Sequence, residues 1–570
     1  MFVYVKNTEM ISKIREETKM NENISVIFGL AGGLALFLYG MNSMSDALQK
    51  AAGERMKKIL EFLTKNPIMG ALAGALVTAV LQSSSATTVM VIGFVSAGLM
   101  SLPQAISVIF GANIGTTMTA QLIAFKLSDY IYPIIFVGFM IHFLSKKEKI
   151  KNVGMVIFSF GLLFEGIEIM GSVMEPLASS PIFINLMGKV AEIPVLGVLL
   201  GLVMTLVVQS SSATIAVLQN FATQAGPDGV TSVIGLAGAI PILLGDNIGT
   251  TITALLASVG QSKNAKRTAV AHSVFNITGS AVFIFFIPAL VKFVEFISPK
   301  GNEVDIISRQ IANAHTTFNV VCTLVWLPLI PLMVKIVTWI IRGKDQEDNL
   351  ACEPKYLDNK VLSQPAAAMY LIKNELEHLS GLTSMMLETL KETIKGKQEK
   401  NRQENLDEAF HAVKGLSESI SSYITRLFAS GNLTEEQSEQ TAVHLYVSNN
   451  IDRIADRCGE VAYICKQMDS SGKRMSEKAL YDLGECIDIS QALFEGSMEA
   501  VQNGDVAYAM EVIDVKDRMR KAQKKLKKDH LTRIKEKECD TALTKEFTQI
   551  LYNLDRIADG CIGIAEEAVE

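Results

Sequence analysis

The sequence predicts an all-α, polytopic membrane protein with two inverted repeats, each containing a re-entrant helical hairpin, followed by a soluble helical bundle. Three observations support this fold class. The mean hydropathy of the 570 residues is +0.29 and 49% of them are apolar, which is high for a soluble chain of this length. After Ile341 the sequence becomes charged and heptad-like. Short polar motifs also recur in the same order within the apolar part.

These changes in composition predict the domain boundaries. The stretch from Ile24 to Met44 is uncharged and about long enough to span a bilayer. It is too long for the apolar core of a signal peptide and has no small-residue cleavage site, so we expect it to be retained. The expected parts are an N-terminal segment (1–23), repeat 1 (24–150), repeat 2 (151–295), an extra transmembrane helix region (296–341), a linker (342–358) and a soluble helical domain (359–570).

Two apolar segments are too short to cross a membrane. Pro67 to Leu81 and Pro194 to Val208 have 15 residues each, so as helices they reach about 22 Å, less than the hydrocarbon thickness of about 30 Å. Each is followed by Gln-Ser-Ser-Ser and then by another short apolar run. Because polar groups in hydrocarbon are costly unless they are satisfied, we expect two re-entrant hairpins that turn at these motifs inside the protein.

The basic residues predict the orientation of the spans. Lys and Arg cluster before the first hairpin, after Leu144 and after Ser258, whereas the loop at 222–231 has none. The positive-inside rule therefore places the three basic loops and the C-terminal domain in the cytoplasm. The first hairpin then enters from inside and the second from outside, and the N-terminus lies outside despite its own positive charges.

The repeated motifs predict that the two halves are homologous. Gln-Ser-Ser-Ser-Ala-Thr recurs 127 residues apart, and Gly-Ala-Asn-Ile-Gly-Thr-Thr at 111–117 recurs as Gly-Asp-Asn-Ile-Gly-Thr-Thr at 245–251. Three membrane crossings separate equivalent positions of the two halves. Because this number is odd, one half is inverted in the membrane relative to the other. Inverted repeats with interrupted helices near the bilayer midplane are typical of secondary transporters.

The chemistry of the motifs favours an oxyanion together with a small cation. At a hairpin tip, the second half-helix begins with free N–H groups and the positive end of its dipole. Serine hydroxyls donate to an oxyanion, while amide and backbone carbonyls coordinate a cation. Neither hairpin contains Lys or Arg, so bound cations have to balance the charge, which is a physical reason for symport. The alternative is that Ser and Thr only satisfy a kink or join helices.

The second motif adds candidate cation ligands. Its glycines permit close backbone approach or an unwound turn, and Asn and Thr supply neutral oxygens. Asp246 stands where the first copy has Ala112, and an intramembrane acid is a functional candidate; helix capping or a water-lined vestibule are the alternatives. Ala-His-x-x-Phe-Asn occurs at 271–276 and 314–319, where we expect hydrogen bonds between helices.

Together these motifs resemble the sodium-dependent phosphate cotransporter family, in its bacterial branch related to the animal type II cotransporters. The resemblance covers about residues 24–341 and implies that phosphate and sodium ions bind between the hairpins. The implied phosphate-binding residues are Gln82, Ser83, Ser84, Ser85, Gln209, Ser210, Ser211 and Ser212. The candidate sodium ligands are Asn113, Thr116, Asp246, Asn247 and Thr250.

The soluble part contains a repeated acidic motif. Asp-Arg-Ile-Ala-Asp occurs twice, and its carboxylates at i and i+4 share one side of a helix. On this motif the soluble part resembles a PhoU-like domain. PhoU-like proteins carry such acidic motifs on paired three-helix bundles, and some bind metal clusters there. The resemblance thus implies a divalent or transition metal at Asp452, Asp456, Asp555 and Asp559. The alternative is a pair of solvated faces with Arg453 and Arg556 as counter-ions.

The functional interpretation is a sodium-coupled inorganic phosphate symporter that works by alternating access in the bacterial inner membrane, with a regulatory cytoplasmic domain. The alternatives are a phosphate exporter of the same family or a non-transporting membrane sensor of phosphate. No nucleophile–base constellation, Walker loop or nucleotide fingerprint indicates an enzyme. Expected partners are phosphate, sodium, the lipid bilayer, and a cytoplasmic regulatory partner or a second copy of the chain. A net charge of −6 gives no reason to expect nucleic acid.

Overall fold

The computed structural model describes residues 22–52, 66–125, 127–178, 185, 188–190, 192–226, 228–343, 353–394, 402–471 and 475–569. These residues are helical almost throughout, which confirms the predicted all-α class. The chain forms two compact units, Met1–Asp345 and Gln346–Glu570. Nearly all of the expected N-terminal segment, and 344–352 of the expected linker, lie outside the described residues.

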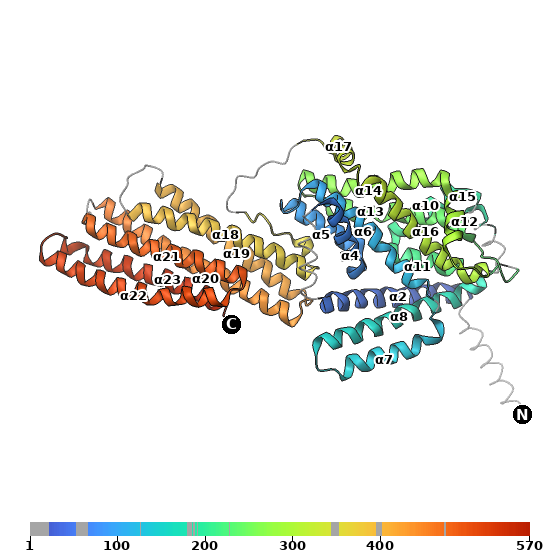
Figure 1. Cartoon of the computed structure of the whole chain (residues 1–570), viewed down its shortest axis with the longest axis horizontal. Coiled ribbons are helices and arrows are strands. Elements are labelled where there is room, and N and C mark those ends of the chain that lie inside the picture. Colours follow the sequence, from blue (N-terminus) through green and yellow to red (C-terminus); the bar gives the residue numbers. More distant parts are fainter. Residues whose placement is uncertain are drawn as a thin grey trace, which may run out of the picture. The chain divides into compact units, whose positions relative to one another are not determined.

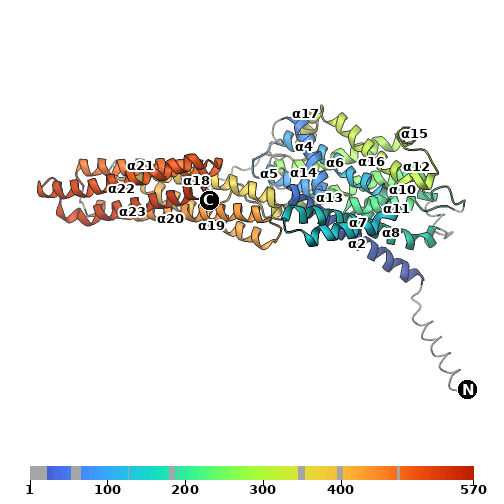
Figure 2. The same ribbon diagram turned by 60° about the horizontal axis from the view of Figure 1, so that its bottom comes forward.

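Three apolar helices, two of them long, form one side of the first unit. They are α2 (Glu22–Ala52), α7 (Ile131–Leu144) and α8 (Glu148–Ala178). Helix α8 packs along both α2 and α7, as both ribbon views show (Figures 1 and 2). Buried Phe37, Leu163 and Met170 belong to the core shared with this layer.

The first hairpin has the predicted boundaries. Helix α4 (Pro67–Leu81) begins where Asn66 accepts a hydrogen bond from the Met69 amide at 2.9 Å and proline occupies the first turn. After a two-residue turn, α5 (Ser84–Ser96) continues, and α6 (Leu102–Ile123) follows. Helix α4 packs along α6, so the hairpin lies against the helix that carries the Gly-Ala-Asn-Ile-Gly motif.

The second hairpin repeats this arrangement. It consists of α10 (Pro194–Val208) and α11 (Ser211–Ala222), followed by α12 (Gly235–Gly249) and α13 (Thr251–Ala257). Helix α10 packs along α12 as α4 does along α6. Equivalent glycines allow both contacts: a Cβ on Gly111 would lie 1.8 Å from the Ala71 carbonyl oxygen, and one on Gly245 would lie 2.0 Å from that of Val198.

The last part of the first unit contains two helix pairs, of which the second is sharply bent. They are α14 (Lys263–Phe283) with α15 (Ile287–Ile297), and α16 (Glu303–Trp326) with α17 (Ile330–Ile340). The expected extra transmembrane helix region, 296–341, contains α16 and α17, which differ in direction by 88°. Pro328 and Pro331 break the apolar run, because proline lacks an N–H and clashes with the preceding turn.

Several helices of the first unit meet the requirements for crossing a membrane. Among the described residues, five are long and apolar enough, or up to six if the bent pair counts as one span. Large apolar side chains cover the outside of this unit, among them Phe285, Phe296 and Trp339, which are 82%, 80% and 70% exposed. An outward-facing apolar surface of this kind fits a lipid environment.

The second unit consists of two three-helix bundles that pack side by side (Figure 2). The first bundle contains α18 (Pro365–Ile394), α19 (Arg402–Ala429) and α20 (Glu435–Ser470); the second contains α21 (Glu477–Asn503), α22 (Val506–Lys535) and α23 (Thr544–Glu566). One apolar core runs through both bundles, and the contacts between them are made by α20 with α23 and α18 with α21. Short 3-10 helices complete the described elements: η1 (Ser128–Tyr130), η2 (Ile284–Phe286), η3 (Asn359–Val361) and η4 (Thr541–Leu543).

Candidate functional site

The two hairpin tips have the same backbone conformation. Gln82 and Gln209 have φ angles of +50° and +54°, in the left-handed region, a conformation that only Lys537 shares among the described non-glycine residues. The next residue, Ser83 or Ser210, is the N-cap of the second half-helix and accepts a hydrogen bond from the amide three residues on, at 3.2 and 3.3 Å. The duplication seen in the sequence is therefore also present in the local structure.

The remaining serines of the motifs start the second half-helices. Ser84 and Ser85 open α5, and Ser211 and Ser212 open α11. Within the described part of the chain, the hydroxyls of Ser84, Ser211 and Ser212 make no hydrogen bond. Free hydroxyls at the positive end of a helix form a site that suits an oxyanion.

The first tip contacts both repeats. The Thr119 hydroxyl of α6 donates to the Gln82 side-chain oxygen at 2.9 Å. Thr253 of α13 lies 134 residues after Thr119, the offset of the Asn-Ile-Gly-Thr motifs, and its hydroxyl donates to Ser85 Oγ at 2.9 Å. The two tips also differ, because Gln82 is buried whereas the Gln209 side chain is exposed.

A pair of threonines joins the two arms of each hairpin. Thr78 and Thr87 hydroxyls lie 2.9 Å apart in the first hairpin, and those of Thr205 and Thr214 lie 3.1 Å apart in the second. These threonines were not among the predicted site residues, although each pair recurs at the 127-residue offset of the Gln-Ser-Ser-Ser motifs. This regularity is the signal that could have found them.

Asp246 makes the second hairpin different from the first. It lies on α12, is completely buried, and accepts a hydrogen bond from the Thr205 hydroxyl at 2.6 Å. Its other carboxylate oxygen, Oδ2, has no hydrogen-bond partner among the described residues. The first half has Ala112 at the equivalent position. A buried carboxylate with one free oxygen is a suitable ligand for a cation.

The other candidate sodium ligands are already engaged in hydrogen bonds. Thr116 donates to the Ala112 carbonyl at 3.2 Å and Thr250 to the Asp246 carbonyl at 2.9 Å, which leaves their oxygen lone pairs available. Asn247 donates to the Leu243 carbonyl at 2.9 Å, whereas the side-chain nitrogen of Asn113 has no partner among the described residues.

Two histidines connect the repeated asparagines to the last helices of the unit. His272 Nε2 on α14 lies 3.0 Å from Asn113 Oδ1, and His315 Nε2 on α16 lies 3.3 Å from Asn247 Oδ1. Both histidines are 1% exposed. The expected hydrogen bonds between helices are confirmed, so the Ala-His-x-x-Phe-Asn motifs position the asparagines in both halves.

The acidic motifs of the second unit bind basic side chains. Lys414 lies 2.8 Å from Asp452 and 2.9 Å from Asp456, and Lys516 lies 2.7 Å from Asp559. Arg556 also contacts Asp559 at 3.1 Å. Within the described residues, no group of three or more His, Cys, Asp and Glu is arranged to hold a metal ion. Of the two counter-ions named in the alternative, Arg556 is paired with Asp559, whereas among the described residues Lys414 rather than Arg453 pairs with the first motif. Metal binding by these carboxylates stays a prediction.

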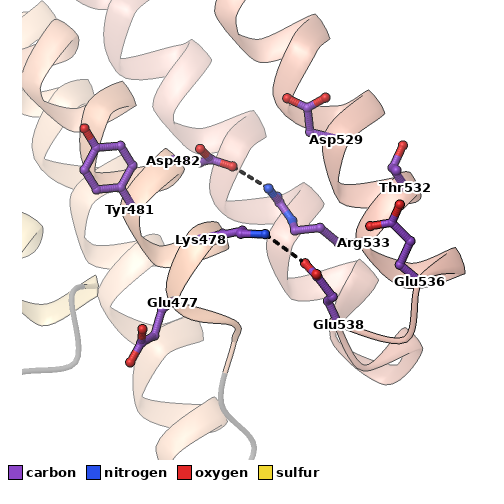
Figure 3. Close-up of a pocket in the computed structure, with 9 residues that line it drawn as sticks. All are labelled: Glu477, Lys478, Tyr481, Asp482, Asp529, Thr532, Arg533, Glu536 and Glu538. Carbon is purple, nitrogen blue, oxygen red and sulfur yellow. Dashed lines mark hydrogen bonds and ion pairs between the residues drawn. The ribbon is translucent and has the colours of Figure 1, made fainter.

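A separate cavity of about 550 Å³ lies between α21 and α22 (Figure 3). Two ion pairs cross it, Arg533 with Asp482 at 2.6 Å and Lys478 with Glu538 at 3.3 Å. Five carboxylates and two basic groups line it, so its charge is negative. The four predicted metal ligands do not line this cavity; its lining residues are Glu477, Lys478, Tyr481, Asp482, Asp529, Thr532, Arg533, Glu536 and Glu538.

Comparison with known families identifies both parts of the chain. The model of the Na+/Pi-cotransporter family matches residues 36–172 and 174–312, so each match contains one hairpin. The model of the PhoU domain matches residues 483–568, which include most of the second bundle. No solved structure matches the chain.

Individual relatives agree with these families. The chain is 34% identical over 274 residues to the uncharacterized protein YqeW of Bacillus subtilis, covering 48% of this chain and 87% of that protein. It is 25% identical over 556 residues to a protein of Escherichia coli K12 named "Putative inorganic phosphate export protein YjbB", covering 95% of this chain and 97% of the relative. A shorter stretch of 97 residues is 37% identical to the sodium-dependent phosphate transport protein 2A of Rattus norvegicus, covering 17% and 15% of the two chains.

The duplicated hairpins, the paired polar motifs and the helical C-terminal unit thus agree with the comparisons. The Na+/Pi-cotransporter family and the relatives with assigned functions are transporters rather than enzymes. Phosphate transport across a membrane is the activity common to those names. This chain belongs to the Na+/Pi-cotransporter family and carries a PhoU domain in its C-terminal unit.

Proposed function

We propose that the chain is a sodium-coupled symporter that binds inorganic phosphate between its two hairpin tips. The observation that carries the proposal is the pair of matching tips, each with a left-handed glutamine followed by serines at the start of a half-helix. A kink that served packing alone would not require unpaired hydroxyls at both tips. Inorganic phosphate carries three or more acceptor oxygens, which match the donors of two such tips.

Charge balance supports sodium as the coupled ion. Neither hairpin contains Lys or Arg, so the bound dianion or monoanion needs another source of positive charge. We assign this role to sodium ions held by Asp246, whose buried Oδ2 has no hydrogen-bond partner among the described residues. Thr116, Thr250, Asn113 and Asn247 are the supporting oxygen ligands in this proposal. Transport would then proceed by alternating access around the bound phosphate.

The proposal also includes the membrane in which the protein lies and the side on which its PhoU domain lies. We place the protein in the inner membrane of a bacterial cell, with the PhoU domain in the cytoplasm, because the basic loops precede and follow the spans on that side. The PhoU domain is proposed to regulate transport, with a cytoplasmic partner, a second copy of the chain or a bound divalent metal as candidate effectors. The boundaries given above for the linker and the repeats belong to this proposal.

The experiment is a flux measurement on purified protein in proteoliposomes. Labelled phosphate is supplied outside, with an inward sodium gradient in one arm and an equal choline gradient in the other. We expect accumulation of phosphate only with sodium. The same accumulation in the choline arm would contradict sodium coupling while leaving phosphate transport in place.

Phosphate export is a second candidate, and one observation favours it. The relatives that match nearly the whole chain, including the PhoU part, are named as export proteins. Vesicles preloaded with labelled phosphate test this candidate in two arms, one free of sodium on both sides and one with sodium inside only. Efflux through the protein in the sodium-free arm supports export without coupling, and efflux only in the arm with sodium inside supports the symporter.

A further inference from the structure

The surface of α22 carries the strongest charge accumulation in the second unit. From Lys516 to Lys535 the helix contains ten Lys or Arg and two Asp. Eight of the basic side chains are exposed: Arg518, Arg520, Lys521, Lys524, Lys525, Lys527, Lys528 and Lys535. We call these eight residues the basic stripe. The whole chain has a net charge of −6, so this concentration of positive charge is opposite in sign to the rest of the protein.

The basic stripe lies opposite the buried face of its helix. Val512, Met519, Gln523, Leu526 and His530 are buried, and at 100° per residue they share one narrow arc. The eight basic side chains cover roughly 200° of the remaining circumference. The stripe is therefore presented away from the bundle core along more than four turns of helix.

The side chains of the basic stripe are almost free of ion pairs. Of the eight, only Arg520 has an acidic partner among the described residues, Asp517, at a long distance of 3.9 Å. The equivalent helix of the first bundle, α19, has three basic residues in its 28 positions. Since the two bundles share the same architecture, the packing of three helices does not require the charge on α22. Unpaired like charges along one face repel each other, so the stripe costs stability unless an anionic surface covers it.

We propose that the basic stripe docks the PhoU domain onto anionic lipid headgroups of the membrane that holds the transport unit. Clusters of four to eight Lys or Arg next to a membrane bind the anionic lipid headgroups of its surface. The domain is joined by chain to a membrane protein, so a bilayer is always close to it. This inference rests on the proposed cytoplasmic position of the domain, where the leaflet is negatively charged.

The composition of the stripe favours lipid over nucleic acid. Proteins that bind single-stranded nucleic acid add aromatic side chains on which bases stack. From Lys516 to Lys535 the only ring is that of His530, which is buried and stacks on Phe547 at 4.1 Å. The stripe is made of flexible cationic side chains alone, which suits a fluid layer of phosphate headgroups without a fixed geometry.

Lysine reactivity in the full-length protein tests the proposal without any transport measurement. The protein is reconstituted into vesicles of neutral phosphatidylcholine or of phosphatidylcholine with phosphatidylglycerol, and then acetylated briefly and mapped by mass spectrometry. We expect Lys521, Lys524 and Lys528 to react at least about threefold more slowly in the anionic vesicles at low salt. The difference should vanish at 1 M salt, where the Debye length is about 3 Å. Exposed Lys466 on α20 is the internal control.

A charge-reversal variant distinguishes protection that depends on the positive charge of the basic stripe from unspecific effects of the vesicles. K521E/K524E/K528E should abolish the lipid-dependent protection of the remaining stripe lysines, whereas K521R/K524R/K528R and K466E should retain it. Equal reactivity of the stripe in neutral and anionic vesicles would overturn the proposal. An RNA oligonucleotide, added to the protein in neutral vesicles at the same concentration of phosphate groups, is the competing ligand. If it protects the stripe lysines more strongly than the anionic lipid does, the proposal is also overturned. Neither result bears on whether the protein transports phosphate, which the flux experiment decides.

Discussion

At the scale of single residues, the site depends on serine hydroxyls that have no other partner in the described structure. Ser84 and Ser211 occupy the first turn of α5 and α11, where a hydroxyl and the helix dipole act on the same anion. Hydrogen bonds to a charged group contribute about 1.5–3 kcal/mol each. The loss of one such bond therefore lowers affinity by roughly tenfold or more.

This predicts that Ser84→Ala and Ser211→Ala each reduce phosphate flux in proteoliposomes by at least about tenfold while leaving the protein inserted. Ser172→Ala is the matched control, because the Ser172 hydroxyl on α8 only bonds to the Ile169 carbonyl of its own helix. Near-normal flux in both tip variants would show that these serine hydroxyls do not coordinate phosphate.

Asp246 is the residue whose chemistry distinguishes the halves. Asp246→Asn keeps the volume and an oxygen for Thr205 but removes the negative charge. We expect the sodium concentration for half-maximal flux to rise about tenfold or more, because a charged ligand is replaced by a neutral one. Asp228→Asn, in the loop before α12, is the control. An unchanged sodium dependence would exclude Asp246 as a ligand.

The thiols of the second unit give a prediction about pH. Burial raises the pKa of Cys486 to about 12, and it raises the pKa values of Cys458 and Cys561 as well. A raised thiol pKa means that the neutral, unreactive form persists well above neutral pH. Alkylation of these three cysteines should thus stay slow from pH 7 to 9 in the folded protein and become fast in denaturant. Partly exposed Cys539 is the comparison, and equally fast labelling of Cys458 would contradict the closed core.

At the scale of elements, the close packing of α4 on α6 and of α10 on α12 sets the position of the hairpins. The side chain of alanine cannot fit where a Cβ would lie within about 2 Å of a backbone oxygen. Overpacking in a rigid core costs about 1–3 kcal/mol, and occasionally more. Each hairpin therefore has a fixed depth relative to the Asn-Ile-Gly-Thr motif beside it.

Gly111→Ala and Gly245→Ala should lower the unfolding temperature measured in detergent by several degrees and reduce flux. Gly32→Ala in α2 is the control, because it is the same substitution in a helix but its Cβ would have no atom within 4 Å. Because alanine favours a helix by about 1 kcal/mol over glycine, that variant should be neutral or slightly stabilising. Equal effects in all three variants would show that the close contacts do not matter.

Sequence patterns predicted the hairpins better than the helices that follow them. Pro67 and Leu81 were located from local signals alone, a proline at the start and a polar motif at the end. The 88° bend after Trp326 was missed, since the run continues apolar through both prolines and hydropathy does not report direction. The lysine partners of the acidic motifs were missed for another reason: Lys414 lies on the preceding helix, and only tertiary packing brings it to Asp452. The inverted relation of the halves stays a prediction.

At the scale of the whole molecule, two units with separate cores share one chain. The apolar core of the second unit is formed only by residues after the linker. We therefore expect a protein that lacks 359–570 to insert and to retain some phosphate flux, with altered regulation. Flux and its response to internal phosphate, compared with the full-length protein at equal amounts in the vesicles, measure this. A truncated protein that inserts correctly but is inactive would show that the second unit is needed for transport itself.

The left-handed glutamines at the two tips affect how the stability and the transport activity of such a protein can change during evolution. A non-glycine residue in this conformation costs about 1 kcal/mol that glycine would recover, and the chain carries this cost at both Gln82 and Gln209. Selection for heat resistance alone would therefore enrich glycine at these positions. Selection for growth on scarce phosphate would restore the amide, so the two pressures oppose each other at the same codons.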